Sequence, residues 1–179
     1  MNTWIAFFRG INVGGASILP MKDLVAIFHK LRFSNVRTYI QSGNVVFQSL
    51  EGSGPQLKKR ISAAVMKSHG FKSHVILMNL EELEKAAASN PFHDAVTDPK
   101  SLHLFFLAEF PANPDMQRLE QVKSESESFA LLGRVFYLHA PDGIGHSRLA
   151  AKAEQLIGVD ATARNWRTVC RVREIAKRS

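Results

Sequence analysis

The hairpin signal that most constrains this chain occurs twice, at an offset of 90 residues. In the first occurrence Ser42-Gly43 precedes the apolar run Val45–Phe47, and in the second Leu132-Gly133 precedes Val135–Tyr137. A glycine-containing turn between two strand patterns indicates a pair of antiparallel strands. Short hairpins also resemble each other by chance, so the interpretation as a duplication depends on the patterns that flank them.

In the first half of the chain, these patterns follow the order β-α-β-β-α-β. The aromatic-rich run at Thr3–Phe8 predicts a buried strand. Helical spacing of apolar residues follows Pro20, and a second helical pattern follows Pro55. With the hairpin at 36–48 and a strand at His74–Met78, this order is the ferredoxin-like arrangement.

The second half repeats most of this order. The expected elements are a strand at Leu102–Ala108, a helix at Pro114–Val122, a hairpin at 129–140 and a helix at Gly145–Leu156. A final strand is not evident, and Asp160–Ser179 is predicted as a capped helix in its place. The fold class is therefore α+β. We expect two ferredoxin-like (βαββαβ-type) subdomains related by duplication, at residues 1–90 and 91–179, the second with an extra basic C-terminal helix.

Composition excludes several classes of protein. A chain of 179 residues can bury a core without covalent staples. Its single cysteine, Cys170, excludes a disulfide framework and a thiolate cluster within one chain, and it favours the reducing cytoplasm. No two histidines have the i, i+4 spacing of a helical metal site, so we predict no metal and no cofactor. No stretch approaches about 20 apolar residues, so no membrane partner is expected.

The net charge of +7 is unevenly distributed along the sequence. Residues 1–90 hold 11 Lys/Arg against 5 Asp/Glu, residues 91–160 hold 6 against 10, and residues 161–179 hold 6 against 1. Positive regions attract phosphates and nucleic acid. A solvated basic face on a terminal helix explains the last of these segments equally simply.

The segment after the first strand is the first candidate site. It contains Arg9, Gly10, Asn12, Gly14 and Gly15. Glycines between a strand and a helix allow consecutive backbone N–H groups to surround an anion, which Arg9 could bind bidentately. The glycine spacing matches neither the phosphate loop nor the dinucleotide fingerprint. The alternative is a connection that needs positive φ angles at several positions.

The second candidate site is the bend of the first hairpin, formed by Gln41, Ser42, Gly43 and Asn44. Two carboxamides within four residues suit recognition of a base edge or another amide. Turn chemistry alone also accounts for Ser, Gly and Asn at such a position.

The third candidate site lies near the C-terminus, at Arg164, Asn165 and Trp166. On the predicted helix, Arg164 shares one arc with three further arginines, and the indole adds a stacking surface typical of nucleic-acid contacts. Arg173 falls on the apolar side, where it must reach solvent, a carboxylate or an anion. An amphipathic helix packed through Trp166 is the alternative.

Several of these stretches resemble one bacterial protein family. They are Phe8–Gly15, Leu19–Leu24, Val36–Phe47, Asn90–Phe92 and Thr162–Val169. Together they resemble the family catalogued as domain of unknown function 1697. The resemblance implies a cytoplasmic α+β protein of two ferredoxin-like subdomains, with its recurrent positions at the three candidate sites. It implies no reaction, because the family has no established activity.

Three functions remain open on the sequence alone. The first is binding of a phosphate-bearing ligand, either nucleic acid or a nucleotide-like metabolite, by three candidate sites that converge on one cleft. The second is a small cofactor-free enzyme for an anionic substrate, in which Arg9 would stabilise a developing negative charge. No catalytic base can be named for it. The third is an interaction module that dimerises through an exposed sheet face, and the sequence leaves the oligomeric state open.

Overall fold

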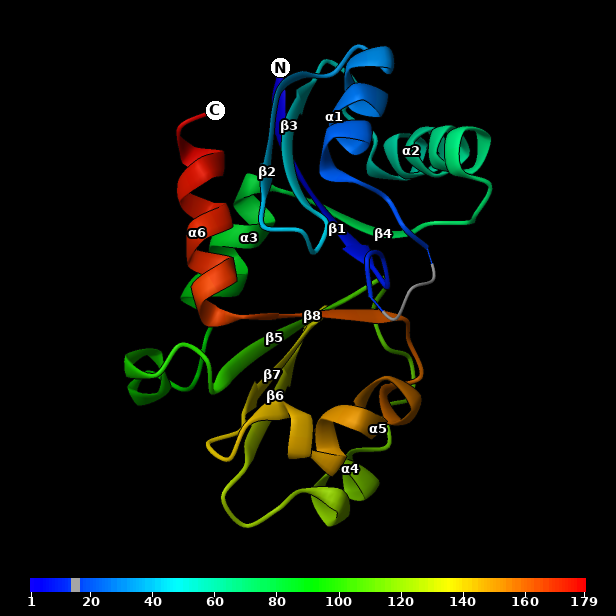
Figure 1. Ribbon diagram of the computed structural model, residues 1–179. Helices are drawn as coiled ribbons and strands as arrows, with labels where there is room; N and C mark the ends of the chain where they lie inside the picture. The colour runs from blue at the N-terminus through cyan, green and yellow to red at the C-terminus, as the bar shows by residue number, and fades with distance from the viewer. Residues whose placement is uncertain (14–16) are drawn as a thin grey trace. The chain divides into compact units, whose positions relative to one another are not determined.

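A computed structural model describes residues 1–13 and 17–179 of the chain (Figure 1). Gly14 and Gly15 of the first candidate site lie outside the described residues. In the first half, the elements are β1 (Asn2–Arg9), α1 (Met21–Lys30), β2 (Ser34–Tyr39), β3 (Asn44–Ser49), α2 (Gly54–His69), β4 (His74–Asn79) and α3 (Leu80–Ala88).

The second half contains another set of strands and helices. They are the 3-10 turn η1 (Asp94–Thr97), β5 (Leu102–Leu107), α4 (Met116–Val122), β6 (Ser128–Leu132), β7 (Val135–His139), the 3-10 turn η2 (Ile144–His146), α5 (Arg148–Ile157), β8 (Ala161–Asn165) and α6 (Trp166–Lys177).

The strands form two four-stranded antiparallel sheets, which confirms the α+β class. The first has the order β2-β3-β1-β4 and the second the order β6-β7-β5-β8. Each sheet contains one hairpin, β2–β3 in the first and β6–β7 in the second. The first strand of each half, β1 or β5, lies between the second hairpin strand and the last strand, β4 or β8. The two halves therefore share one strand order.

Contacts within the chain group it into two compact units. Unit 1 comprises Met1–Lys85 and Arg171–Ser179, and unit 2 comprises Ala86–Cys170. The sequence placed a boundary at residue 90 and assigned the whole C-terminal helix to the second subdomain. In the structure the boundary falls inside α3, and the second part of α6 belongs to unit 1.

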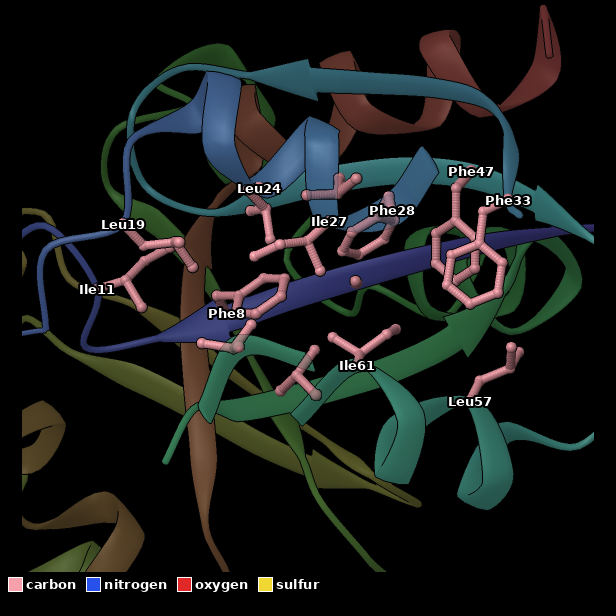
Figure 2. Packing of buried hydrophobic residues seen from close by; sticks show 14 of the residues in the cluster. Phe8, Ile11, Leu19, Leu24, Ile27, Phe28, Phe33, Phe47, Leu57 and Ile61 are labelled. Carbon is pink, nitrogen blue, oxygen red and sulfur yellow. The ribbon is translucent and has the colours of Figure 1, made fainter. Parts of the chain in front are cut away.

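The core of unit 1 lies between the first sheet and helices α1 and α2 (Figure 2). Alternate residues of β1 face it because successive strand side chains point to opposite faces. Phe28 of α1 stands at the centre, with its ring centroid 5.0 Å from that of Phe47 and 5.5 Å from that of Phe33. Leu57 and Ile61 of α2, both fully buried, close the cluster from the other helix.

The core of unit 2 is built in the same way, from one face of the second sheet and helices α4 and α5. Phe105 of β5 and Phe136 of β7 meet edge to face, with ring centroids 5.5 Å apart. Leu119 of α4 and Leu149 of α5 are fully buried against them.

Short local patterns in the sequence explain where several helices begin and end. Gly70 and Gly158 end α2 and α5 in the left-handed conformation, with φ angles of 74° and 77°. The Ser147 hydroxyl accepts a hydrogen bond from the backbone N–H of Ala150, as expected of the residue that caps α5. Asn79 and Glu82 form a reciprocal capping box before α3.

The prediction of one continuous helix over Asp160–Ser179 is wrong. Residues Ala161–Asn165 form β8, which pairs antiparallel with β5, and α6 begins only at Trp166. The helical pattern of arginines concealed this short strand. Arg164 consequently lies on a strand and does not share a helical arc with the arginines that follow.

Candidate functional site

The bend of the first hairpin packs directly onto the end of β1. The backbone N–H of Phe8 donates to the carbonyl of Gly43 at 2.8 Å. Gly43 has a φ angle of 71°, and a Cβ at this position would lie 2.6 Å from Cβ of Phe8 and 2.7 Å from Cδ1 of Ile11. Only glycine meets both requirements, so this residue sets the distance between the bend and the first loop.

Asn12 joins the first loop to the same bend. Its Nδ2 donates to the carbonyl of Leu19 at 2.9 Å and to the carbonyl of Gln41 at 3.0 Å, while its Oδ1 accepts the N–H of Leu19 at 2.8 Å. Asn12 has a φ angle of 58°, in the left-handed region that asparagine tolerates better than most residues. Its carboxamide therefore closes the loop and fixes it against the hairpin.

Asn44 and Ser42 stabilise the bend from within. The Nδ2 of buried Asn44 donates to the carbonyl of Tyr39 and to Oγ of Ser42, each at 3.0 Å. These bonds support the turn-chemistry explanation for both residues. The side chain of Gln41 is exposed to solvent.

Arg9 and Gly10 stand where β1 ends. Arg9 is half-buried and lies opposite His74 of β4. Gly10 has a φ angle of 67°, and among the described residues no atom beyond its chain neighbours lies within 4 Å of the place where a Cβ would be. Asn12, two positions later, is also left-handed. We call Arg9–Asn12 and Gln41–Asn44 together the loop–bend junction.

The third candidate group lies in unit 2. Nη1 of Arg164 donates to Oγ1 of Thr162 and to the carbonyl of Ala163, both at 2.7 Å. Loss of solvent around the guanidinium lowers the pKa of Arg164 to about 10, so it remains charged at neutral pH. Oδ1 of Asn165 accepts the N–H of Thr168 and caps α6, whose first residue is the half-buried Trp166.

The structure thus brings the first and second candidate groups together within unit 1. The third belongs to unit 2, and its convergence with the other two on one cleft stays a prediction. Asn12, Asn44 and Asn165 also have structural roles that the sequence did not distinguish from ligand binding.

The charge of the chain is divided between the units. Unit 1 holds 15 Lys/Arg and 6 Asp/Glu, a net charge of +9, whereas unit 2 holds 8 and 10, a net charge of −2. Helix α2 alone carries four basic residues and no acidic residue. The C-terminal residues 171–179 add to the positive charge of unit 1.

Arg173, which was expected to reach solvent, a carboxylate or an anion, forms an ion pair with a carboxylate. Its Nε lies 2.7 Å from Oε1 of Glu84 on α3, and Nζ of Lys177 lies 3.3 Å from the same oxygen. Hydrogen bonds from these two cations outweigh burial and lower the pKa of Glu84. This pair joins the C-terminal segment to the rest of unit 1.

Unit 2 contains a cavity that sequence reasoning missed. Its volume is about 300 Å³, and Lys123, Glu127, Asp142, His146 and Arg148 are among the residues that line it. Both charge signs are present, so the cavity favours neither an anion nor a cation.

Across residues 1–13 and 17–179, no three His, Cys, Asp or Glu side chains are grouped as a metal would require. No helix in the same ranges has the length and apolarity to span a membrane.

His103 of β5 is buried, and its Nδ1 has no hydrogen-bond partner among the described residues. Burial lowers the pKa of His103 below 6.5, and a backbone hydrogen bond with Ser101 only partly opposes this. The unfolded chain therefore binds this proton more readily than the folded chain. The contribution of neutral His103 to the free energy of unfolding is complete above about pH 6.5, and it is lost as the pH falls through the lowered pKa.

Replacement of His103 with leucine should flatten this pH dependence. Between pH 7.5 and pH 5.5 the unfolding free energy of His103→Leu should fall less than that of the wild type, because no buried imidazole must be protonated. Urea unfolding at both pH values measures the difference. The exposed His29→Leu serves as the matched control and should retain the wild-type slope. Equal slopes for all three proteins would contradict the expectation.

The strand order defines an α+β protein built from two four-stranded antiparallel sheets. The conserved bacterial protein SP0830 from Streptococcus pneumoniae shares this fold, with a TM-score of 0.72, 22% sequence identity and coverage of 98% of each chain. The family model described as protein of unknown function (DUF1697) matches residues 1–137, and the chain belongs to this family. A search of curated proteins gave no match. The matched residues include the loop–bend junction and end before Arg164.

Proposed function

We propose that the protein binds a phosphate-bearing ligand, either nucleic acid or a nucleotide-like metabolite, at the loop–bend junction. One observation carries this proposal: the unit that contains the junction also holds a net charge of +9, while the other unit is slightly acidic. Such a field raises the local concentration of anions and accelerates their association.

Each residue of the junction has a proposed role. Arg9 contacts the phosphate bidentately, and the backbone N–H groups that follow it in the junction donate to the same phosphate. Gln41, exposed at the bend, recognises a polar edge of the ligand. Asn12 and Gly43 act as positioning residues.

Arg164, Asn165 and Trp166 are proposed as a second group of ligand-binding residues, in unit 2. A charged guanidinium and an indole at the start of α6 suit contact with a second phosphate and with a base.

We further propose that both halves have the ferredoxin-like topology. Their common strand order, with both helices of unit 1 on one face of its sheet, supports this assignment. The cytoplasm is the proposed location, because a chain with a single cysteine, Cys170, forms no internal disulfide.

A binding titration tests the function. Labelled single-stranded and duplex oligonucleotides, and separately ATP and pyrophosphate, are titrated with the protein at low and moderate salt. We expect saturable binding of at least one probe, weaker as salt rises because bound counterions are released. Absence of binding to every probe at low salt would overturn the proposal.

A pair of arginine variants tests the site. Arg9→Gln should weaken binding about tenfold, since a charge-assisted bidentate contact contributes about 1.5–3 kcal/mol. The control Arg178→Gln removes an equal charge from the exposed end of the same unit and should change the affinity by less than threefold. Equal losses in both variants would mean that diffuse charge, and not the junction, binds the ligand.

A further inference from the structure

Strand β6 forms one edge of the second sheet. It pairs with β7 on one side, and within the described part of the chain no strand pairs with its other side. Its sequence, Ser-Phe-Ala-Leu-Leu, contains no charge and no proline. Alternate residues of an edge strand turn their N–H and C=O groups outward, and an uncharged edge of this kind is a template for another strand.

The matching edge strand of the first sheet, β2, is protected. The exposed Arg37 lies within β2, and its pairing with β3 shifts register between Ser34 and Arg37. Asn35, at the shift, has a φ angle of 49°. A charged side chain and a break in the strand register both hinder edge-to-edge pairing of sheets. In contrast, β6 pairs with β7 in unbroken register over all five residues.

The hairpin tip beside β6 also exposes apolar surface. Leu132 is 46% exposed and Phe110 is 73% exposed. The Phe110 ring lies beside the tip, with Cε1 3.7 Å from where a Cβ on Gly133 would be and the Arg134 guanidinium 6.0 Å from the ring centroid. The open edge is thus continuous with an apolar contact surface.

The charges that flank β6 favour one kind of partner strand. The exposed Glu125 precedes the strand, and Arg134 follows it at the hairpin tip. If two copies of β6 pair antiparallel about Ala130, Phe129 of each lies opposite the partner's Leu131. In the same register, Glu125 of each copy lies toward the hairpin tip of the other, where Arg134 follows β6. A parallel pairing would instead oppose acid with acid.

We propose that β6 pairs with β6 of a second copy of this chain, antiparallel about Ala130, and joins two four-stranded sheets into one of eight strands. The interface is isologous, because each copy contributes the same edge. This inference is independent of the ligand proposed for unit 1, since every residue that it uses belongs to unit 2.

Sedimentation velocity of the full chain, from micromolar to near-millimolar concentration, tests the proposal. The wild type should shift from monomer to dimer with rising concentration. Ala130→Lys sets two like charges against each other at the twofold axis and should weaken dimerisation at least tenfold. Leu50→Lys, at a leucine that is 85% exposed in unit 1, should behave as the wild type.

A charge-swap experiment tests the register. Ala130→Lys and Ala130→Asp should each be monomeric alone, and an equimolar mixture should form the dimer again. Circular dichroism establishes that both variants fold, and Leu132→Lys, at an exposed position, replaces Ala130→Lys if that variant does not. A monomer at every concentration overturns the proposal and leaves the edge to a strand of another protein. A wild-type dimer that neither lysine variant weakens also overturns it.

Discussion

Replacement of Gly43 with alanine is expected to lower the free energy of unfolding of unit 1 by about 3 kcal/mol. The left-handed backbone disfavours any Cβ, and the new methyl would overlap Phe8 and Ile11, which are both buried. The chain has two tryptophans, and Trp4 lies in unit 1. In a Trp166→Phe background, the fluorescence of Trp4 during urea unfolding reports this loss directly.

Gly70→Ala provides the matched control for Gly43→Ala. Gly70 has nearly the same φ angle, 74°, but in residues 1–13 and 17–179 no atom outside its own helix and its chain neighbours lies within 4 Å of its missing Cβ. Its replacement should therefore cost only the conformational penalty of about 1–2 kcal/mol. The difference between the two variants measures the packing of the bend on β1. Equal losses would show that this close approach contributes nothing.

Replacement of Asn12 with alanine is the second change with a large expected effect. The variant loses the hydrogen bonds to Leu19 and Gln41 and retains a residue with a Cβ at positive φ, so a loss of about 2–3 kcal/mol is expected. Hydrogen exchange at the Leu19 amide gives a local measurement, because this N–H donates to Oδ1 of Asn12 in the wild type.

The control for this experiment is Asn12→Gly, which removes the same hydrogen bonds but adopts the left-handed conformation freely. It should recover about 1 kcal/mol relative to Asn12→Ala, while the exchange of the Leu19 amide should be fast in both variants. If that amide stays as protected as in the wild type, Asn12 does not fix the first loop. The same result would remove its proposed positioning role.

The features of the fold that depend on local chemistry could be predicted from the sequence. Glycine helix stops at Gly70 and Gly158 and the cap at Ser147 are encoded within a few neighbouring residues. The first hairpin was predicted in the same way, because its turn and both strands are contiguous. Apolar periodicity then located most of the remaining elements.

Strand β8 could not be predicted in this way. Its five residues, Ala-Thr-Ala-Arg-Asn, lack large apolar side chains, and its stability comes from pairing with β5, which lies far away in the sequence. The arginine pattern that continues into α6 therefore dominated the interpretation. Tertiary pairing decided the structure of a segment whose own propensity is weak.

The candidate site was predictable in part for the same reason. The first two candidate sites, the loop after β1 and the bend of the first hairpin, do contact each other, through Asn12 and Gly43. The sequence could not show that Asn12 uses its side chain for structure, because its partner Gln41 lies 29 residues later in the chain. Asn44 bonds within its own hairpin, to Tyr39 and Ser42, which is the turn chemistry that the sequence left as an alternative. Likewise, Arg173 required a carboxylate, but Glu84 lies 89 residues earlier.

The discontinuity of unit 1 bears on how a ribosome-bound chain acquires its structure. Residues 171–179 complete unit 1, and the whole of unit 2 is translated before them. The ion pairs of Glu84 with Arg173 and Lys177 can therefore form only after unit 2 has been translated. All residues of unit 2 are present by that point. The N-terminal unit, which usually matures first during synthesis, here receives its last segment only after all of unit 2 has been synthesised.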